Sequence, residues 1–173
     1  VGGENRVPGK SDGSSKIALW LEIAPEVKAV QHLLREAAQE EQVDVELLKA
    51  MVAVESGFNA KAQSPRGALG LMQITPETAQ RYATPAEARR PVRELLLDPR
   101  SNLLIGARML HDLLQRYSKI DVALAAWNAG EGTVRRAGGK MPAIAETQAH
   151  VQMVLELYWA LMQRGTPHGM PNG

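Results

Sequence analysis

The sequence predicts an all-α protein with a single folded domain. Apolar residues recur at the three- and four-residue spacing of amphipathic helices through most of the chain, whereas few segments show the two-residue alternation of strands. Residues that favour helix starts and stops separate these segments. The chain has 173 residues, of which 45% are hydrophobic, so it can bury one core about which the helices pack.

The two ends of the chain lack this helical periodicity. Residues 1–16 are rich in glycine, serine and charged residues, and residues 165–173 are rich in glycine and proline. Compositions of this kind favour disorder, so we expect an N-terminal arm or linker at 1–16 and a C-terminal tail at 165–173. The folded domain is then expected to span residues 17–164.

The first two predicted helices lie between residues 25 and 56. Pro25 suits the first turn of a helix whose apolar residues recur on one face up to Ala38. Asp44 is a good N-cap for a second helix over residues 45–56, which Gly57 should end.

Four further helices are predicted along the rest of the chain. Threonine or aspartate followed by proline marks the starts of helices over residues 75–82 and 98–117. Asp121 is expected to cap a helix that ends at residue 130, and the last helix is expected over residues 144–163.

Composition excludes several classes of site. The chain has no cysteine, so disulfides, thiolate metal ligands and thiol nucleophiles are ruled out. The four histidines lack metal-ligand spacing, and we expect no metal or organic cofactor. Twenty basic and nineteen acidic residues leave a net charge of +1, which gives no general attraction to nucleic acid. No apolar run approaches the roughly 20 residues that a membrane-spanning helix needs.

One acidic residue interrupts the apolar face of the predicted helix 45–56. Glu55 follows Met51 by four residues and Val52 by three, so it shares their face. Partial withdrawal from water and the negative end of the helix dipole both favour the protonated form of a carboxyl group there. A protonated carboxyl group is what general-acid catalysis requires. The alternative is a surface glutamate that pairs with a nearby base such as Lys61.

Two further clusters could serve a ligand. Residues 62–73 form a loop with two glycines, at which backbone groups can approach a bound molecule closely, although such loops are often only structural. Trp127 and Asn128 lie near the end of a predicted helix, where an indole ring can stack on a sugar and an amide can bind hydroxyl groups. The alternative is that Trp127 anchors the core and Asn128 only helps to end the helix.

Taken together and in this order, four segments resemble the catalytic domain of the soluble lytic transglycosylases, the lysozyme-like family that cleaves peptidoglycan. The segments are residues 55–58 (ESGF), 64–73 (SPRGALGLMQ), 126–130 (AWNAG) and 146–147 (ET). The first two, at their spacing, carry most of the specificity. The resemblance covers about residues 33–161 and implies a lysozyme-like helical domain with a glycan-binding groove.

The resemblance also implies roles, position by position. Glu55 matches the sole catalytic acid and base of the family. The residues that match substrate-contacting positions are Ser64, Met72, Gln73, Trp127, Asn128 and Glu146. The chain departs from the family at two positions, because Trp127 and His150 stand where tyrosine is usual. Both changes keep a ring but alter its polar group, which bears on rate and substrate preference more than on the reaction class.

The reaction that the resemblance implies needs one carboxyl group. Most glycosidases use two carboxylates, and the sequence offers Glu55 no obvious partner. A lytic transglycosylase protonates the oxygen between N-acetylmuramic acid and N-acetylglucosamine. The muramic C6 hydroxyl then attacks C1 and yields a 1,6-anhydro sugar without water, helped by the high effective molarity of an intramolecular attack.

Two other functions remain open at this point. A lysozyme-like muramidase would use Glu55 in the same way but let water attack C1. A glycan-binding or scaffold module without catalysis is also compatible with the tryptophan at position 127, although such a module has no chemical reason to keep an acid on an apolar helix face.

The resemblance implies a bacterial location and a set of partners. Peptidoglycan lies outside the cytoplasmic membrane, so we expect a periplasmic or cell-envelope protein whose partner is the glycan strand. A role in wall turnover and a role in opening the wall for a secretion or conjugation assembly are equally compatible with the sequence. We expect a monomer that binds no nucleic acid and has no membrane span in this chain.

Overall fold

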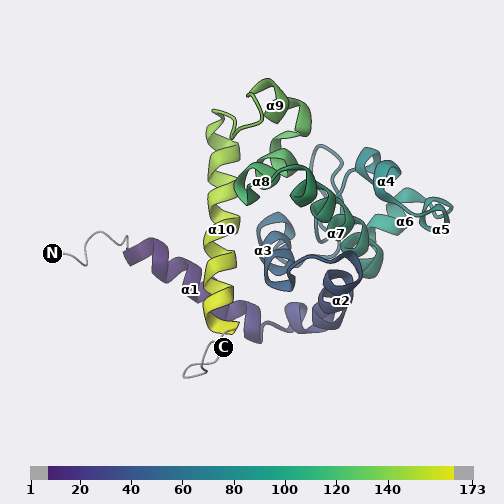
Figure 1. The fold of residues 1–173 in the computed structure, drawn as a ribbon. Helices are drawn as coiled ribbons and strands as arrows, with labels where there is room; N and C mark the ends of the chain where they lie inside the picture. Colours follow the sequence, from purple (N-terminus) through teal and green to yellow (C-terminus); the bar gives the residue numbers. More distant parts are fainter. Residues whose placement is uncertain (1–7, 166–173) are drawn as a thin grey trace.

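The computed structural model describes residues 8–165 as a helical bundle (Figure 1). The all-α prediction is confirmed, because the described residues contain no strand and only isolated bridges at Gln63, Leu69 and Ile74. In chain order the helices are α1 (Pro8–Ile23), α2 (Pro25–Glu41), α3 (Val45–Ser56), α4 (Pro76–Tyr82), α5 (Pro85–Ala88), α6 (Val92–Leu97), α7 (Pro99–Arg116), α8 (Ile120–Ala129), α9 (Glu131–Arg136) and α10 (Ala145–Gly165).

Helix α3 forms the centre of the bundle. Every residue from Leu47 to Val52 is buried, including Lys49, so this helix is enclosed on all sides at mid-length. Helices α2 and α10 pack directly against it, and α7 and α8 complete the surrounding layer (Figure 1). The helix is short, but its burial fixes its position with respect to the whole core.

The N-terminus of α3 is tied to α10. One oxygen of Asp44 accepts a hydrogen bond from the backbone N–H of Glu46 at 2.9 Å, as expected for the predicted N-cap. The other oxygen accepts a hydrogen bond from the Tyr158 hydroxyl at 2.7 Å. Burial, together with this bond to a carboxylate, raises the pKa of Tyr158 to about 12, so the hydroxyl keeps its proton at neutral pH.

The predicted N-terminal arm is partly wrong. Residues 8–16 belong to α1, whereas residues 1–7 lie outside the described part of the chain. The C-terminal half of α1 buries Ala18 and Leu21 in the core, and helix growth from this packed end needs no further nucleation. Gly165 is likewise the last residue of α10, and the rest of the predicted tail, residues 166–173, lies outside the described residues.

Three short helices, α5, α6 and α9, were not predicted, because four to six residues cannot display a helical period. The signal for α5 was a capping box, in which Thr84 and Glu87 exchange side-chain and backbone hydrogen bonds. The predicted cap of α8 is also wrong. Lys119 is the N-cap, and Asp121 lies in the first turn, where it accepts a hydrogen bond from the Val122 N–H.

Asn102 of α7 holds the loop between α3 and α4. Its side chain is fully buried, and its oxygen accepts a hydrogen bond from the Met72 N–H at 2.8 Å. Its amide nitrogen donates to the carbonyls of Leu69 at 2.9 Å and Leu96 at 2.8 Å. One side chain therefore bonds three buried backbone groups, of which the Leu69 carbonyl also accepts a hydrogen bond from the Ile74 N–H at 3.0 Å.

Gly70 allows the close approach that these bonds require. Its φ of +77° lies in the left-handed region, and a Cβ there would lie 2.3 Å from the carbonyl oxygen of Leu96. No other residue type fits both conditions.

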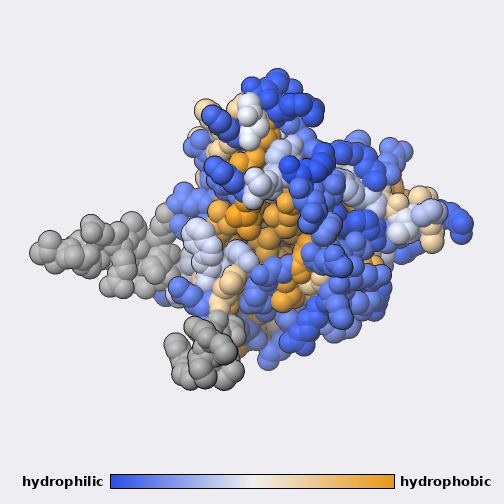
Figure 2. All heavy atoms as spheres, in the orientation of Figure 1, coloured by the Kyte–Doolittle hydropathy of each residue, from blue (hydrophilic) through white to orange (hydrophobic). Residues whose placement is uncertain are grey.

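The outer surface is mostly hydrophilic. Figure 2 shows apolar residues gathered near the middle of one face, around α3 and α8 and beside α10, within a hydrophilic periphery. Among the described helices, none combines the length and the apolar character needed to cross a bilayer.

Replacement of Asn102 by alanine should lower the free energy of unfolding by about 2–4 kcal/mol, because the buried Met72 N–H and Leu96 carbonyl lose this partner and the Leu69 carbonyl keeps only the Ile74 N–H. Urea denaturation followed by circular dichroism measures this change. Asn128→Ala is the matched control, since Asn128 is exposed and should change stability by less than about 1 kcal/mol. Equal stabilities for the two variants would show that Asn102 does not hold the loop.

Candidate active site

Glu55 is the penultimate residue of α3 and lies where the buried helix reaches the surface. Its side chain is 16% exposed, so it shares the apolar face of α3 as predicted but is open at one edge. Among the described residues it forms no ion pair with a lysine or arginine, and the surface pairing with Lys61 is not formed. Gly57 ends the helix directly after it, with φ +60° and its N–H bonded to the Ala53 carbonyl.

Two aromatic side chains from other helices converge on one oxygen of Glu55. The indole Nε1–H of Trp127, near the end of α8, donates to Oε2 at 3.2 Å. The imidazole Nε2 of His150, in the second turn of α10, lies 2.8 Å from the same oxygen. The side chain of His150 is only 15% exposed. The two departures from the expected tyrosines therefore meet at the predicted catalytic acid.

The loop that follows α3 presents two of the predicted substrate residues. The Ser64 hydroxyl oxygen accepts hydrogen bonds from the N–H groups of Arg66 and Ala68 at 3.2 and 3.0 Å, which leaves its own O–H free to donate. The Gln73 amide nitrogen donates to the carbonyls of Ala62 and Gly70 at 3.2 and 3.0 Å. The Gln73 amide therefore holds the loop together, and its side-chain oxygen is its remaining polar group.

The side chain of Met72, a residue predicted to contact substrate, lies in the core. Met72 is fully buried, and a Cβ on Gly106 of α7 would lie 2.2 Å from its sulfur, so the thioether fills a space that only glycine leaves open. The turn at Gln73 has a left-handed φ of +54°, and the residues on either side of it, Met72 and Ile74, are both buried in the core. Met72 packs inward against α7 and supports the loop from below.

The remaining predicted residues, Asn128 and Glu146, are exposed. Asn128 directly follows Trp127 in α8, and Glu146 lies four residues before His150 on α10, so it shares the face of His150. Both therefore lie beside the residues that contact Glu55.

A charged network fixes α9, which follows the Trp127-Asn128 segment. Glu131, the first residue of α9, accepts hydrogen bonds from Arg116 at 2.8 Å, from Arg81 at 3.3 Å and from the Tyr117 hydroxyl at 3.3 Å. Burial favours the neutral acid, but the hydrogen bonds from Arg116 and Arg81 outweigh it and hold the pKa of Glu131 below its usual value. The network anchors the end of α8 to α4 and α7.

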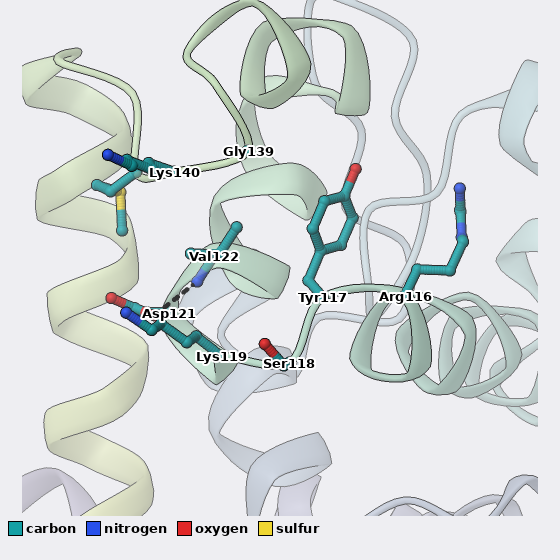
Figure 3. Close-up of a pocket in the computed structure, with 9 residues that line it drawn as sticks. Arg116, Tyr117, Ser118, Lys119, Asp121, Val122, Gly139 and Lys140 are labelled. Carbon is teal, nitrogen blue, oxygen red and sulfur yellow. Dashed lines mark hydrogen bonds between the residues drawn. The ribbon is translucent and has the colours of Figure 1, made fainter.

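A pocket of about 540 Å³ lies at the opposite end of α8 (Figure 3). Residues at the start of α8 and in the segment after α9 line it, among them Lys119, Asp121 and Lys140. It contains none of the predicted site residues, so it is distinct from the Glu55 cluster. Within the part of the chain that the structure describes, no group of three histidine or acidic side chains could hold a metal ion.

Comparison with known proteins identifies the family. A family model described as the Transglycosylase SLT domain matches residues 32–149, which is more than half of the chain. The chain belongs to the transglycosylase SLT family. The resemblance noted in the sequence is thereby confirmed. The matched region of the SLT domain begins within α2 and ends one residue before His150.

Curated relatives of this SLT domain are longer proteins. It is 35% identical over 123 residues to the membrane-bound lytic murein transglycosylase C of Haemophilus influenzae, covering 64% of this chain and 34% of that protein. It is 34% identical over 128 residues to the soluble lytic murein transglycosylase of Escherichia coli K12, covering 61% of this chain and 19% of that protein. The chain therefore spans about a third or less of the length of these relatives.

Solved structures share the fold of the SLT domain. The 70-kDa soluble lytic transglycosylase of Escherichia coli has a TM-score of 0.68 at 27% identity, covering 78% of this chain and 24% of that one. An inactive glutamate-to-glutamine mutant of the lytic transglycosylase Slt of Pseudomonas aeruginosa has a TM-score of 0.67 at 27% identity, with the same coverage. The predicted lysozyme-like all-α fold is confirmed.

His150 is the residue at this site that the sequence analysis did not assign. It was noted as a departure from the family, but its contact with Glu55 joins residues 95 positions apart, which no local pattern reveals. A signal was nevertheless available, because Glu146 and His150 are four residues apart on one predicted helix. A role for Glu146 at the site implied that the His150 ring would face it too.

Glu131→Gln should lower the free energy of unfolding by about 1–2 kcal/mol at pH 7, a modest value because the partner arginines are partly exposed. The pKa of Glu131 is lowered in the folded state, so its contribution is complete above the ordinary value of 4.5 and is lost as pH falls through the folded value. The stability difference between wild type and variant should therefore shrink below about pH 4.5. Urea denaturation at pH 7 and pH 3.5 measures it.

Glu40→Gln is the matched control for this experiment, because Glu40 is exposed. Its effect should be small at both pH values. A difference between wild type and Glu131→Gln that stays constant from pH 7 to pH 3.5 would contradict a stabilising role for the charge of Glu131.

Proposed function

We propose that this chain is a lytic transglycosylase that cleaves the β-1,4 bond between N-acetylmuramic acid and N-acetylglucosamine in peptidoglycan. The observation that carries the proposal is the half-enclosed carboxyl group of Glu55 at the end of a buried helix. Ring nitrogens of Trp127 and His150 hold one of its oxygens, and among the described residues no lysine or arginine forms an ion pair with it. The names of the curated relatives, which are murein transglycosylases, support the same reaction. A solved relative described as inactive after one glutamate-to-glutamine change supports a single essential acid.

The first step is proton donation by Glu55. Its carboxyl proton passes to the glycosidic oxygen, the bond from C1 of the muramic residue to that oxygen breaks, and the glucosamine end leaves with a hydroxyl group. Positive charge develops at C1, and the acetamido group of the substrate can stabilise it, as in the substrate-assisted exceptions among glycoside-cleaving enzymes.

The second step returns the proton to Glu55. The C6 hydroxyl of the same muramic residue attacks C1, and its proton passes to the carboxylate that the first step produced. The product is a 1,6-anhydro ring, Glu55 is restored to its acid form, and no water is consumed. One carboxyl group therefore serves as acid and then as base, and no second carboxylate is needed.

The glycan strand is proposed to pass over the exposed polar groups on either side of Glu55. The hydroxyl of Ser64 and the amide oxygen of Gln73 are available on the loop side. Asn128 and Glu146 are exposed on the side of α8 and α10. Amide and hydroxyl groups of this kind pair with the hydroxyl and acetamido groups of the sugars.

The substrate sets the location that we propose. Peptidoglycan strands lie outside the cytoplasmic membrane, so the chain would act in the periplasm or elsewhere in the cell envelope. The relatives that it matches are described as membrane-bound or soluble murein transglycosylases, which supports an envelope location.

Glu55→Gln should reduce turnover of purified peptidoglycan by at least about 10²-fold, because the amide cannot donate or accept the proton. Release of soluble fragments, identified by mass spectrometry, measures turnover. Glu77→Gln is the matched control, because Glu77 is an exposed glutamate in the first turn of α4. Circular dichroism should give the same folded spectrum for both variants and wild type.

The masses of the products distinguish the proposed reaction from the muramidase reaction. Anhydro products are lighter by one water than hydrolysed products, and we expect only the lighter series from wild type. Hydrolysed products would replace the proposal by a muramidase. Ordinary activity of Glu55→Gln would refute the assignment of the acid, and an inactive wild type would favour a glycan-binding module.

A further inference from the structure

The two oxygens of Glu55 have different surroundings. Oε2 accepts a hydrogen bond from the Trp127 Nε1–H at 3.2 Å and lies 2.8 Å from His150 Nε2. Oε1 makes no hydrogen bond with any described residue, and it is not one of the buried polar atoms that lack a partner. One oxygen is therefore held inside the protein, while the other is open to solvent.

The surroundings of the imidazole ring indicate which nitrogen carries its proton. Nδ1 of His150 is buried and has no hydrogen-bond partner among the described residues. A buried N–H without an acceptor is rarer and more costly than a buried lone pair without a donor. The neutral ring therefore carries its proton on Nε2, and His150 donates a hydrogen bond to Glu55 Oε2 just as Trp127 does.

We propose that His150 is a positioning residue that, together with Trp127, holds Oε2 of Glu55 and thereby assigns proton transfer to Oε1. This inference rests on the proposed function, because it concerns how Glu55 performs its two steps. The region that matches the SLT family model ends before His150, so the role of this residue follows from the contacts of this chain.

The arrangement serves both protonation states of Glu55. In the acid form the proton lies on Oε1, and Oε2 is a carbonyl oxygen that can accept two hydrogen bonds. After the proton has passed to the glycosidic oxygen, Oε2 still accepts the same two bonds. The proton of the C6 hydroxyl then returns to Oε1. Neither donor has to move between the steps, so the geometry is kept ready for both transfers.

The test compares three variants at His150 with wild type on soluble, uncrosslinked peptidoglycan strands. His150→Phe keeps a ring without a donor, and its kcat should fall about five- to tenfold while KM changes less than about twofold. His150→Gln and His150→Tyr keep a neutral donor and should recover at least half of the wild-type kcat at neutral pH.

His32→Gln is the matched control, because His32 is an exposed histidine on α2. Its kcat and its KM should equal those of wild type. Thermal unfolding of each His150 variant separates loss of the fold from loss of positioning. If His150→Phe proves unstable, the kcat values of the glutamine and tyrosine variants still decide the question, because both keep a donor to Oε2.

Two results would overturn the inference. The first is a wild-type kcat for His150→Phe, and the second is a loss of kcat in folded His150→Gln and His150→Tyr that is as large as the loss expected for His150→Phe. Neither result affects the proposed function, which depends on the anhydro products of wild type and on the loss of turnover in Glu55→Gln. A wild type without anhydro products would remove the proposed function itself.

Discussion

The rest of the structure depends on the way in which α3 is held at both ends by α10. Asp44, the N-cap of α3, accepts the hydroxyl hydrogen bond of Tyr158, and Glu55, near its C-terminus, meets the imidazole of His150. The two helices therefore run antiparallel, and the buried stretch between the two contacts sets their separation. A carboxyl group placed at the end of such a helix cannot swing freely, because the backbone that carries it is enclosed by packed side chains. The geometry of the site follows from this packing.

Local features of the sequence predicted the central part of the molecule well. Asp44 and Gly57 delimit α3 because capping depends on residues within a few positions of each other. The position of Glu55 on an apolar face followed from helical spacing alone. The start of α1 and the short helices α5, α6 and α9 could not be predicted in the same way. The first is stabilised by burial of its distant half, and the others are shorter than the period that would reveal them.

The site itself was predictable in its residue types but not in its contacts. Met72 stands beside Gln73 in a motif of the family, yet the space beside Gly106, far along the chain, decides that its side chain points inward. The hydrogen bonds from Trp127 and His150 to Glu55 likewise join three helices. Such contacts are set by how helices pack, and a single sequence records them only as residue types at fixed positions. The departures from tyrosine became informative only when the structure brought both rings to the same oxygen.

The dependence of the loop on Asn102 has a consequence for how this protein can vary. Residues 69–73 are hydrogen-bonded to the Asn102 side chain of α7. An insertion there would shift the loop and leave the buried Asn102 amide without these partners. The tip at residues 65–67 is exposed and has open space around it, provided that Gly67, whose φ is +88°, stays glycine. Length variation among natural homologues, and any graft of a longer specificity loop, is therefore best tolerated at this tip, whereas the segment from 69 to 73 can be transplanted only together with its partner on α7.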